Sequence, residues 1–155
     1  MTQLFRRILC PIDLSEHSLA ALDVALKLAQ QNDARLYLLN VAPMQAGAAG
    51  FHPVPMDPYP IVEKDKREQL EKLARERIPA AVRCETHVTT GDPAKQVLET
   101  ARDLDADLIV MGTHGRKGLG HLALGSVAER VVRESPIPVL TAHATAHVRK
   151  AALDR

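Results

Sequence analysis

The sequence predicts an α/β fold, with a single doubly wound parallel sheet of five strands and helices on both faces. Short apolar runs alternate along the chain with longer segments in which apolar residues recur at helical spacing. The chain has 155 residues, the usual size of one domain, and 46% of them are hydrophobic, which is enough to bury a core. Right-handed crossovers between alternating strands and helices allow few topologies, and among them we choose the doubly wound strand order 3-2-1-4-5.

The first strand and helix are predicted within residues 7–33. Residues 7–13 form an apolar run that ends at Asp13, and Ser15 is a residue type that caps helices. The following helix is expected to bury the apolar residues that share one face: Leu19, Leu22, Leu26 and Ala29. It ends at Asn32-Asp33.

The second strand, residues 34–41, precedes a proline-rich segment. Five prolines and two glycines lie within residues 43–60. Prolines at this density oppose regular structure, so we expect a long mobile loop. Residues 61–78 return to a helical pattern, and we interpret their charged outer face as solvated surface.

The third strand is predicted at residues 82–90. The pair Asp92-Pro93 then indicates a helix start, because an acid can cap the helix and proline fits its first turn. Its apolar face comprises Ala94, Val97, Leu98, Ala101 and Leu104. Residues 107–111 predict a fourth, buried strand.

The last part of the chain is rich in glycine. Four glycines follow Gly112, and the last of them opens the pair Gly125-Ser126. A helix is predicted at residues 126–134 and a fifth strand at 137–141, whose proline favours a sheet edge. We expect residues 143–155 to form a loosely held tail, so the domain spans residues 1–142.

Doubly wound, Rossmann-like sheets bind ligands at the carboxyl ends of strands, where the strand order reverses. The order 3-2-1-4-5 puts this point between the first and fourth strands, which end at Asp13 and Gly112. Glycines let a ligand approach backbone N–H groups, and a helix N-terminus attracts anions. The glycine-rich segment therefore predicts a phosphate site.

Two common phosphate motifs do not explain this segment. For a P-loop counted from Gly112, the second glycine position holds Lys117, and counted from Gly115, the lysine position holds His121. A dinucleotide pattern, G-x-G-x-x-A, begins at Gly118, but it follows the fourth strand and lacks a suitable ribose-binding acid downstream. We disfavour both readings.

The spacing that fits is Gly112-x2-Gly115-x9-Gly125-Ser126. It resembles the ATP-binding branch of the universal stress protein family, whose signature is G-x2-G-x9-G-[ST]. Residues 7–18 are similar to the family's first strand and acid-containing turn, and residues 126–140 to its last helix and strand. The resemblance covers residues 3–142 and is weakest in the proline-rich segment and the tail.

The resemblance implies an adenosine pocket between the first and fourth strands, with ATP as the cofactor, with or without Mg²⁺. The implied ATP-binding residues are Pro11, Ile12, Asp13, Val41, Met111, Gly112, Thr113, His114, Gly115, Arg116, Lys117, Gly125, Ser126 and Val127. Asp13 would accept hydrogen bonds from ribose hydroxyls or the adenine amino group, or else only cap the following turn. Val41 would contact adenine or simply pack in the core.

The remaining residues of the signature have their own alternatives. Gly112, Gly115 and Gly125 would let backbone N–H groups face phosphate oxygens. Ser126 forms a capping-box pattern with Glu129, a role compatible with a hydrogen bond to phosphate. Arg116 and Lys117 would neutralise the triphosphate or remain solvated.

The function implied by the resemblance is a non-enzymatic, ATP-binding regulator of the stress response that acts through an unidentified protein partner. We assign no catalytic residue, because the loop lacks an acid to position a water. A slow ATP hydrolase or phosphotransferase and a nucleotide-free stress interaction module remain alternatives. Since the family commonly dimerises through its fifth strands, we expect a homodimer through residues 137–142.

Composition narrows the location and the partners. The net charge of +1 gives no general argument for nucleic acid. The chain shows no signal-peptide pattern and no apolar run of membrane-spanning length, so we expect a cytoplasmic protein. Cys10 and Cys84 do not suggest a disulfide framework, and no metal site is expected.

Overall fold

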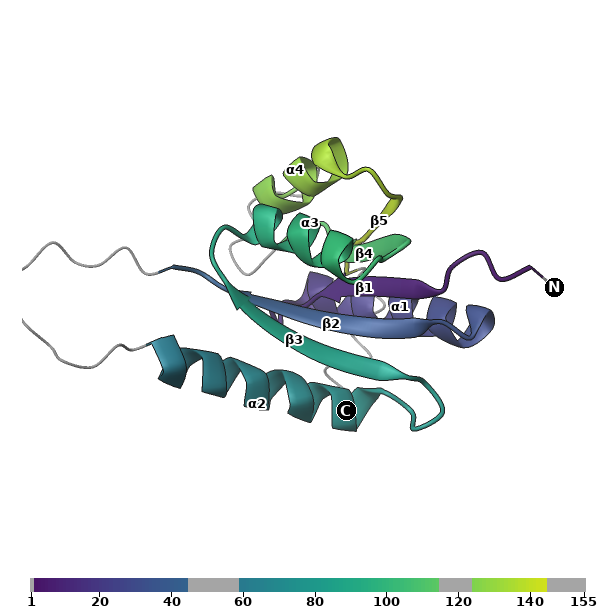
Figure 1. Ribbon diagram of the computed structural model, residues 1–155, viewed down its shortest axis with the longest axis horizontal. Helices are drawn as coiled ribbons and strands as arrows, with labels where there is room; N and C mark the ends of the chain where they lie inside the picture. Colours follow the sequence, from purple (N-terminus) through teal and green to yellow (C-terminus); the bar gives the residue numbers. More distant parts are fainter. Residues whose placement is uncertain (1, 45–58, 115–123, 145–155) are drawn as a thin grey trace, which may run out of the picture.

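The computed structural model describes residues 2–44, 59–114 and 124–144 (Figure 1). Most of the proline-rich segment, nearly all of the tail and the predicted site residues Gly115, Arg116 and Lys117 lie outside these ranges. Strands and helices alternate along the chain as predicted: β1 (Arg7–Pro11), α1 (Glu16–Asn32), β2 (Arg35–Ala42), α2 (Tyr59–Arg77), β3 (Cys84–Thr90), α3 (Pro93–Asp103), β4 (Leu108–Gly112), α4 (Ser126–Glu134) and β5 (Val139–Ala142).

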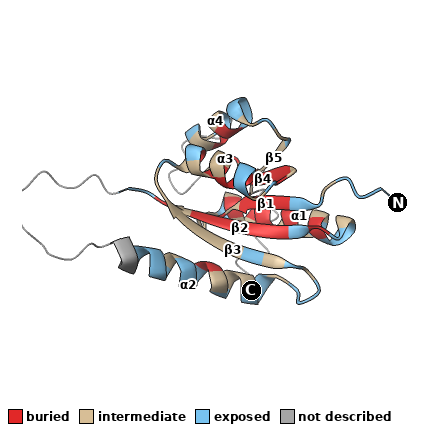
Figure 2. Ribbon diagram, viewed as in Figure 1, coloured by how far each residue is buried: buried red, intermediate tan, exposed pale blue. Residues whose placement is uncertain are grey.

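The five strands form one parallel sheet in the order β3-β2-β1-β4-β5, which confirms the predicted topology. The two faces of the sheet are covered by different helices. Leu22 of α1 and Leu70 of α2 belong to one core cluster, whereas Val97 of α3 and Val131 of α4 belong to the other. Figure 2 shows the buried residues concentrated in the central strands between these layers.

Helix α1 packs through small residues, which the sequence interpretation misjudged. Leu22 and Ala29 are buried as expected, but Leu19 and Leu26 are only half-buried. The rest of the buried apolar face is formed by Ala20, Ala21 and Ala25. The buried face of α1 is therefore centred on alanines and not on the leucines that the prediction used. Alanines bring a helix backbone closer to a sheet than leucines do.

Two element boundaries at prolines also differ from expectation. Helix α2 begins at Tyr59, so Pro60 lies in its first turn and not in the loop. This placement suits proline, because the first N–H groups of a helix have no intrahelical partner. Pro138 immediately precedes β5 and does not lie within it, while β5 does form a sheet edge. Across the described ranges, no helix is long and apolar enough to cross a membrane.

Candidate functional site

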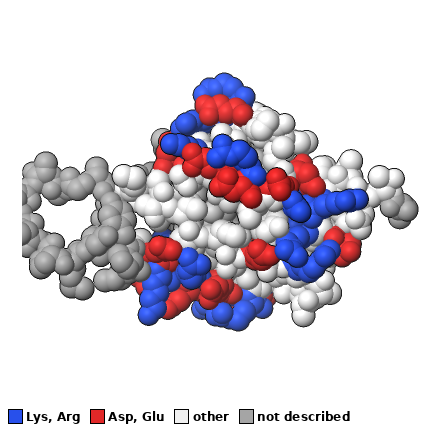
Figure 3. Space-filling model, viewed as in Figure 1, with Lys and Arg blue, Asp and Glu red and all other residues white. Residues whose placement is uncertain are grey.

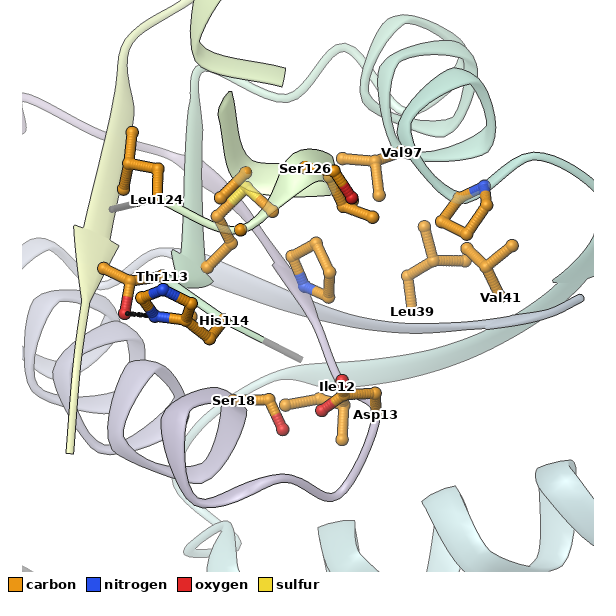
Figure 4. A pocket seen from close by; sticks show the side chains of 17 residues that line it. Ile12, Asp13, Ser18, Leu39, Val41, Val97, Thr113, His114, Leu124 and Ser126 are labelled. Carbon is orange, nitrogen blue, oxygen red and sulfur yellow. Dashed lines mark hydrogen bonds between the residues drawn. The ribbon is translucent and has the colours of Figure 1, made fainter. Parts of the chain in front are cut away.

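A cavity of about 560 Å³ lies at the carboxyl ends of β1 and β4 (Figure 4). This volume is within the usual range for small-molecule sites. All the predicted site residues that the structure describes line it: Pro11, Ile12, Asp13, Val41, Met111, Gly112, Thr113, His114, Gly125, Ser126 and Val127. In Figure 4, Asp13 lies on one side of the cavity, and Ser126 lies across it.

Six further residues line the cavity and were not predicted: Ser18, Leu39, Pro93, Val97, Leu124 and Ala128. Leu39 was recognisable in principle, because it lies two residues before Val41 in a strand and so faces the same side. Pro93 and Val97 come from α3, whose approach to the cavity depends on tertiary packing. Together with Val41, these residues make one wall of the cavity apolar.

The turn after β1 presents Asp13 to the cavity. The Ile12 N–H continues the ladder to β2 by donating to the Leu39 carbonyl at 2.7 Å. Oδ1 of Asp13 accepts a hydrogen bond from the Ser15 N–H at 2.9 Å, and Leu14 between them has a left-handed φ of 66°. Asp13 therefore does cap the turn, as one of the two readings held. A carboxylate has a second oxygen with which it can bind a ligand.

Helix α4 begins at the far side of the cavity without a side-chain cap. Its N-cap is Gly125, whose carbonyl accepts from the Glu129 N–H at 2.9 Å. Ser126 is the first helical residue, so the predicted capping box with Glu129 is wrong, and Glu129 pairs with Arg133 instead. The first N–H groups of a helix lack intrahelical partners, so those of Ser126 and Val127 are available to an anion.

Gly112 and Gly125 serve packing at close backbone contacts. A Cβ on Gly112 would lie 2.7 Å from the carbonyl carbon of His17 in α1. Gly125 donates its N–H to the Thr113 carbonyl at 2.6 Å, and a Cβ there would lie 3.0 Å from that oxygen. The Gly125 N–H is thus engaged within the protein, so the N–H groups near Gly125 that a phosphate could reach are those of Ser126 and Val127. Gly125 instead joins the end of β4 to the start of α4.

Two histidines, one in α1 and one after β4, meet beside the cavity. His114 Nδ1 lies 3.1 Å from the Thr113 hydroxyl (Figure 4). The rings of His114 and His17 are 5.3 Å apart. His17 Nδ1 accepts the Ala144 N–H at 3.0 Å. The cluster therefore connects the cavity rim to the chain that follows β5. His17 was not predicted, because nothing in its local sequence distinguishes it from a surface histidine.

An ion pair joins the start of α3, which contributes to the apolar wall of the cavity, to α4, whose N-terminus borders the cavity. Asp92 caps α3 by accepting the Lys95 N–H at 2.9 Å, and both its oxygens accept from Nη1 of Arg130 in α4, at 2.9 and 2.8 Å. The Lys95 hydrogen bond, together with Arg130, lowers the pKa of Asp92. Figure 3 shows charges of both signs over α2 and over α3 and α4, with an uncharged band between them.

Comparison with known proteins identifies relatives over almost the whole chain. The model of the universal stress protein family matches residues 4–143. Universal stress protein MJ0531 of Methanocaldococcus jannaschii is 35% identical over 141 residues, which covers 88% of this chain and 81% of that protein.

Solved structures agree with this assignment. A member of the same family from Burkholderia pseudomallei is 30% identical, with a TM-score of 0.67 over 93% of this chain and all of that one. A universal stress protein solved in complex with cAMP is 27% identical, with a TM-score of 0.64 over 91% of this chain and 98% of that one.

Proposed function

The chain belongs to the universal stress protein family, and from this premise we propose that it binds ATP in the cavity between β1 and β4. The observation that carries the proposal is the pairing of Asp13 at one end of this cavity with the open N-terminus of α4 at the other. A related protein solved with cAMP supports an adenine nucleotide as the ligand class.

The adenosine moiety fits the end of the cavity formed by β1 and β2. Leu39 and Val41 supply apolar surface for a base, and the Asp13 carboxylate supplies acceptors for ribose hydroxyls. Pro11, Ile12 and Met111 complete this end at the switch point of the sheet. Thr113 and His114 border the path from here to α4.

The phosphates fit the end formed by Gly125, Ser126 and Val127. Oxygens there would accept the first N–H groups of α4 and the Ser126 hydroxyl, which is exposed and makes no hydrogen bond within the described ranges. Gly115, Arg116 and Lys117 belong to the same proposed site through the sequence signature. The two cations would balance the triphosphate charge, with or without Mg²⁺.

The proposed role is regulatory and non-enzymatic. Among the described lining residues, Asp13 is the single carboxylate, and it lies at the adenosine end and caps its own turn. A carboxylate in this place, with this role, does not suit the task of orienting a water at a terminal phosphate. We propose that bound ATP alters the surface offered to a protein partner in the cytoplasm, where the free Cys10 and Cys84 would stay reduced.

The experiment that tests ATP binding is ligand-dependent stabilisation. ATP at about 100 times its Kd should raise the free energy of unfolding by about 2.7 kcal/mol. Thermal unfolding with and without Mg-ATP measures this, and mass spectrometry of the purified protein under native conditions detects retained nucleotide. GTP at equal concentration is the control for base recognition. An unchanged unfolding temperature with no retained nucleotide would refute the proposal.

We also propose a homodimer through the β5 edge, residues 137–142. Leu140 in this edge strand is 36% exposed, and Val132 in the adjacent α4 is 44% exposed. An uncovered apolar strand edge pairs readily with another strand. Light scattering at micromolar concentration should report a dimer for the wild type and a monomer for Leu140→Lys. A monomeric wild type contradicts this assignment without bearing on ATP binding.

A further inference from the structure

The turn that carries Asp13 is fastened to β2 by a side chain on the opposite face of the sheet from the cavity. Asn40 in β2 is only 7% exposed. Its neighbours Leu39 and Val41 line the cavity. Because side chains alternate across a strand, Asn40 faces the other side, as do Leu36 and Leu38 in the core beneath α1 and α2.

Asn40 holds the peptide that directly follows β1. Its Nδ2 donates to the Ile12 carbonyl at 2.7 Å, while the Ile12 N–H donates to the Leu39 carbonyl at the same distance. Two consecutive residues of β2 therefore bind both polar groups of Ile12. In a strand that continued, a backbone amide of β2 would bind that carbonyl. The side chain takes this place, and the backbone turns immediately afterwards through Asp13 and Leu14.

The second polar atom of the Asn40 amide shows that this arrangement is not optimal for stability. Oδ1 is buried and has no hydrogen-bond partner among the described residues. Buried amide oxygens without partners destabilise a fold, and leucine, present at positions 36 and 38, would avoid this. The orientation of the amide is set by chemistry, because the Ile12 carbonyl can only accept and must face Nδ2.

We infer that Asn40 is a positioning residue for the nucleotide pocket. It fixes the Ile12 carbonyl, and the fixed peptide keeps the turn from Asp13 to Ser15 in the conformation that offers the free carboxylate oxygen to ribose. Asn40 itself touches no ligand. The inference rests on the proposed ATP site for its functional consequence, whereas its structural part concerns the turn alone.

The first test compares ATP affinity with stability. Asn40→Leu removes the donor and keeps the branching and the number of side-chain heavy atoms, so we expect ATP Kd to rise about tenfold or more while the unfolding temperature stays equal or rises. Asn40→Val also removes the donor and serves if the leucine variant misfolds. Thr100→Val is the matched control, because Thr100 is also buried but lies in α3 and does not line the cavity.

The second test asks whether Asn40 acts through Asp13. In an Asp13→Ala background, Asn40→Leu should raise Kd by less than about threefold, since residues that act through one another are not additive. A full tenfold loss in that background overturns the inference, because Asn40 would then act by another route.

The third test needs no nucleotide. Amide hydrogen exchange at Ser15, whose N–H binds Asp13 Oδ1, should become at least about tenfold faster in Asn40→Leu than in wild type or Thr100→Val. Unchanged exchange overturns the inference, because the turn is then held without Asn40. Faster exchange with unchanged ATP affinity also overturns it. If the wild type binds no adenine nucleotide, the proposed function fails, and Ser15 exchange alone decides whether Asn40 holds the turn.

Discussion

Gly112 at the end of β4 lies directly against the backbone of His17 in α1. A Cβ on Gly112 would sit 2.7 Å from the His17 carbonyl carbon and 2.8 Å from the Ser18 nitrogen. Side-chain motion cannot relieve either contact, because both involve backbone atoms. The first glycine of the signature is therefore required for the seating of α1 on the sheet, whatever else it does for a ligand.

Gly112→Ala should consequently destabilise the protein even without nucleotide. Forcing a methyl group into a closed backbone contact costs about 1–3 kcal/mol. Urea unfolding without ligand measures this as a lower midpoint with an unchanged slope. A variant with the wild-type midpoint but weaker ATP binding would restore the reading in which this glycine serves the phosphates alone.

Ser15 and Ser126 form a matched pair, since both stand at helix starts but only one caps. Ser15 is the N-cap of α1 and accepts the Ser18 N–H, whereas the cap of α4 is Gly125. Ser15→Ala should lower the free energy of unfolding by about 1 kcal/mol. Ser126→Ala should change it by less than about 0.5 kcal/mol.

The same pair separates stability from binding. Loss of a hydroxyl that binds a charged phosphate should weaken ATP binding by about tenfold in Ser126→Ala. Isothermal titration calorimetry measures the affinity, with chemical unfolding in parallel. Equal destabilisation of both variants would return Ser126 to a capping role.

The Asp92–Arg130 pair should make stability depend on pH in acid. The Lys95 N–H bond and Arg130 lower the pKa of Asp92 from its ordinary value of 3.8. A carboxyl whose pKa falls on folding stabilises the protein above its unfolded pKa, and this contribution disappears as the pH falls through the folded pKa. Asp92→Ala should therefore be less stable than wild type at pH 6, with the difference shrinking below about pH 4.

Urea unfolding of both proteins between pH 6 and pH 2.5 measures this convergence. Asp92→Asn is the informative control, because it keeps an N-cap oxygen and loses the charge. It should lie between the other two at pH 6. A difference between wild type and Asp92→Ala that stays constant through the acid range would rule out the ion pair as its source.

The two cysteines should be unreactive in the folded protein. Burial, with a smaller contribution from Glu85, raises the pKa of Cys84 to about 11, and burial raises that of Cys10 further. At pH 8 the thiolate fraction of Cys84 is then ~10⁻³, against about a quarter for an ordinary thiol. The reaction of the folded protein with a thiol reagent should be slow and should accelerate about tenfold per pH unit. Cys84→Ser should abolish this slow reaction. Fast modification at pH 7 contradicts this.

The sheet order and the location of the cavity followed from the sequence because they depend on patterns that repeat along the chain. Alternating strands and helices restrict the topology, and Asp13 and Gly112 both stand where a central strand ends. The predictions that were wrong concern details that depend on contacts between distant parts of the chain. Leu19 and Leu26 have helical spacing, but alanines bury more fully because α1 approaches the sheet so closely.

The prediction from local motifs was least reliable at Ser126, which the glycine signature and the capping-box pattern share. Ser126 and Glu129 match a capping box, yet the preceding Gly125 is held in the cap position by its bond to the Thr113 carbonyl, 12 positions earlier in the chain. Asn40 carried no recognisable signal, because a polar residue within an apolar strand gains meaning only when its partner is known. Its partner, Ile12, follows the end of the neighbouring strand β1.

The bond between Gly125 and Thr113 also affects the conformational entropy of the chain between them. It joins the two flanks of the segment that carries Gly115, Arg116 and Lys117. The entropy cost of closing this loop is therefore part of the free energy of folding. Since closure entropy grows slowly with length, residues 115–123 could be exchanged for segments of different length while Ser126 and Val127 keep their places.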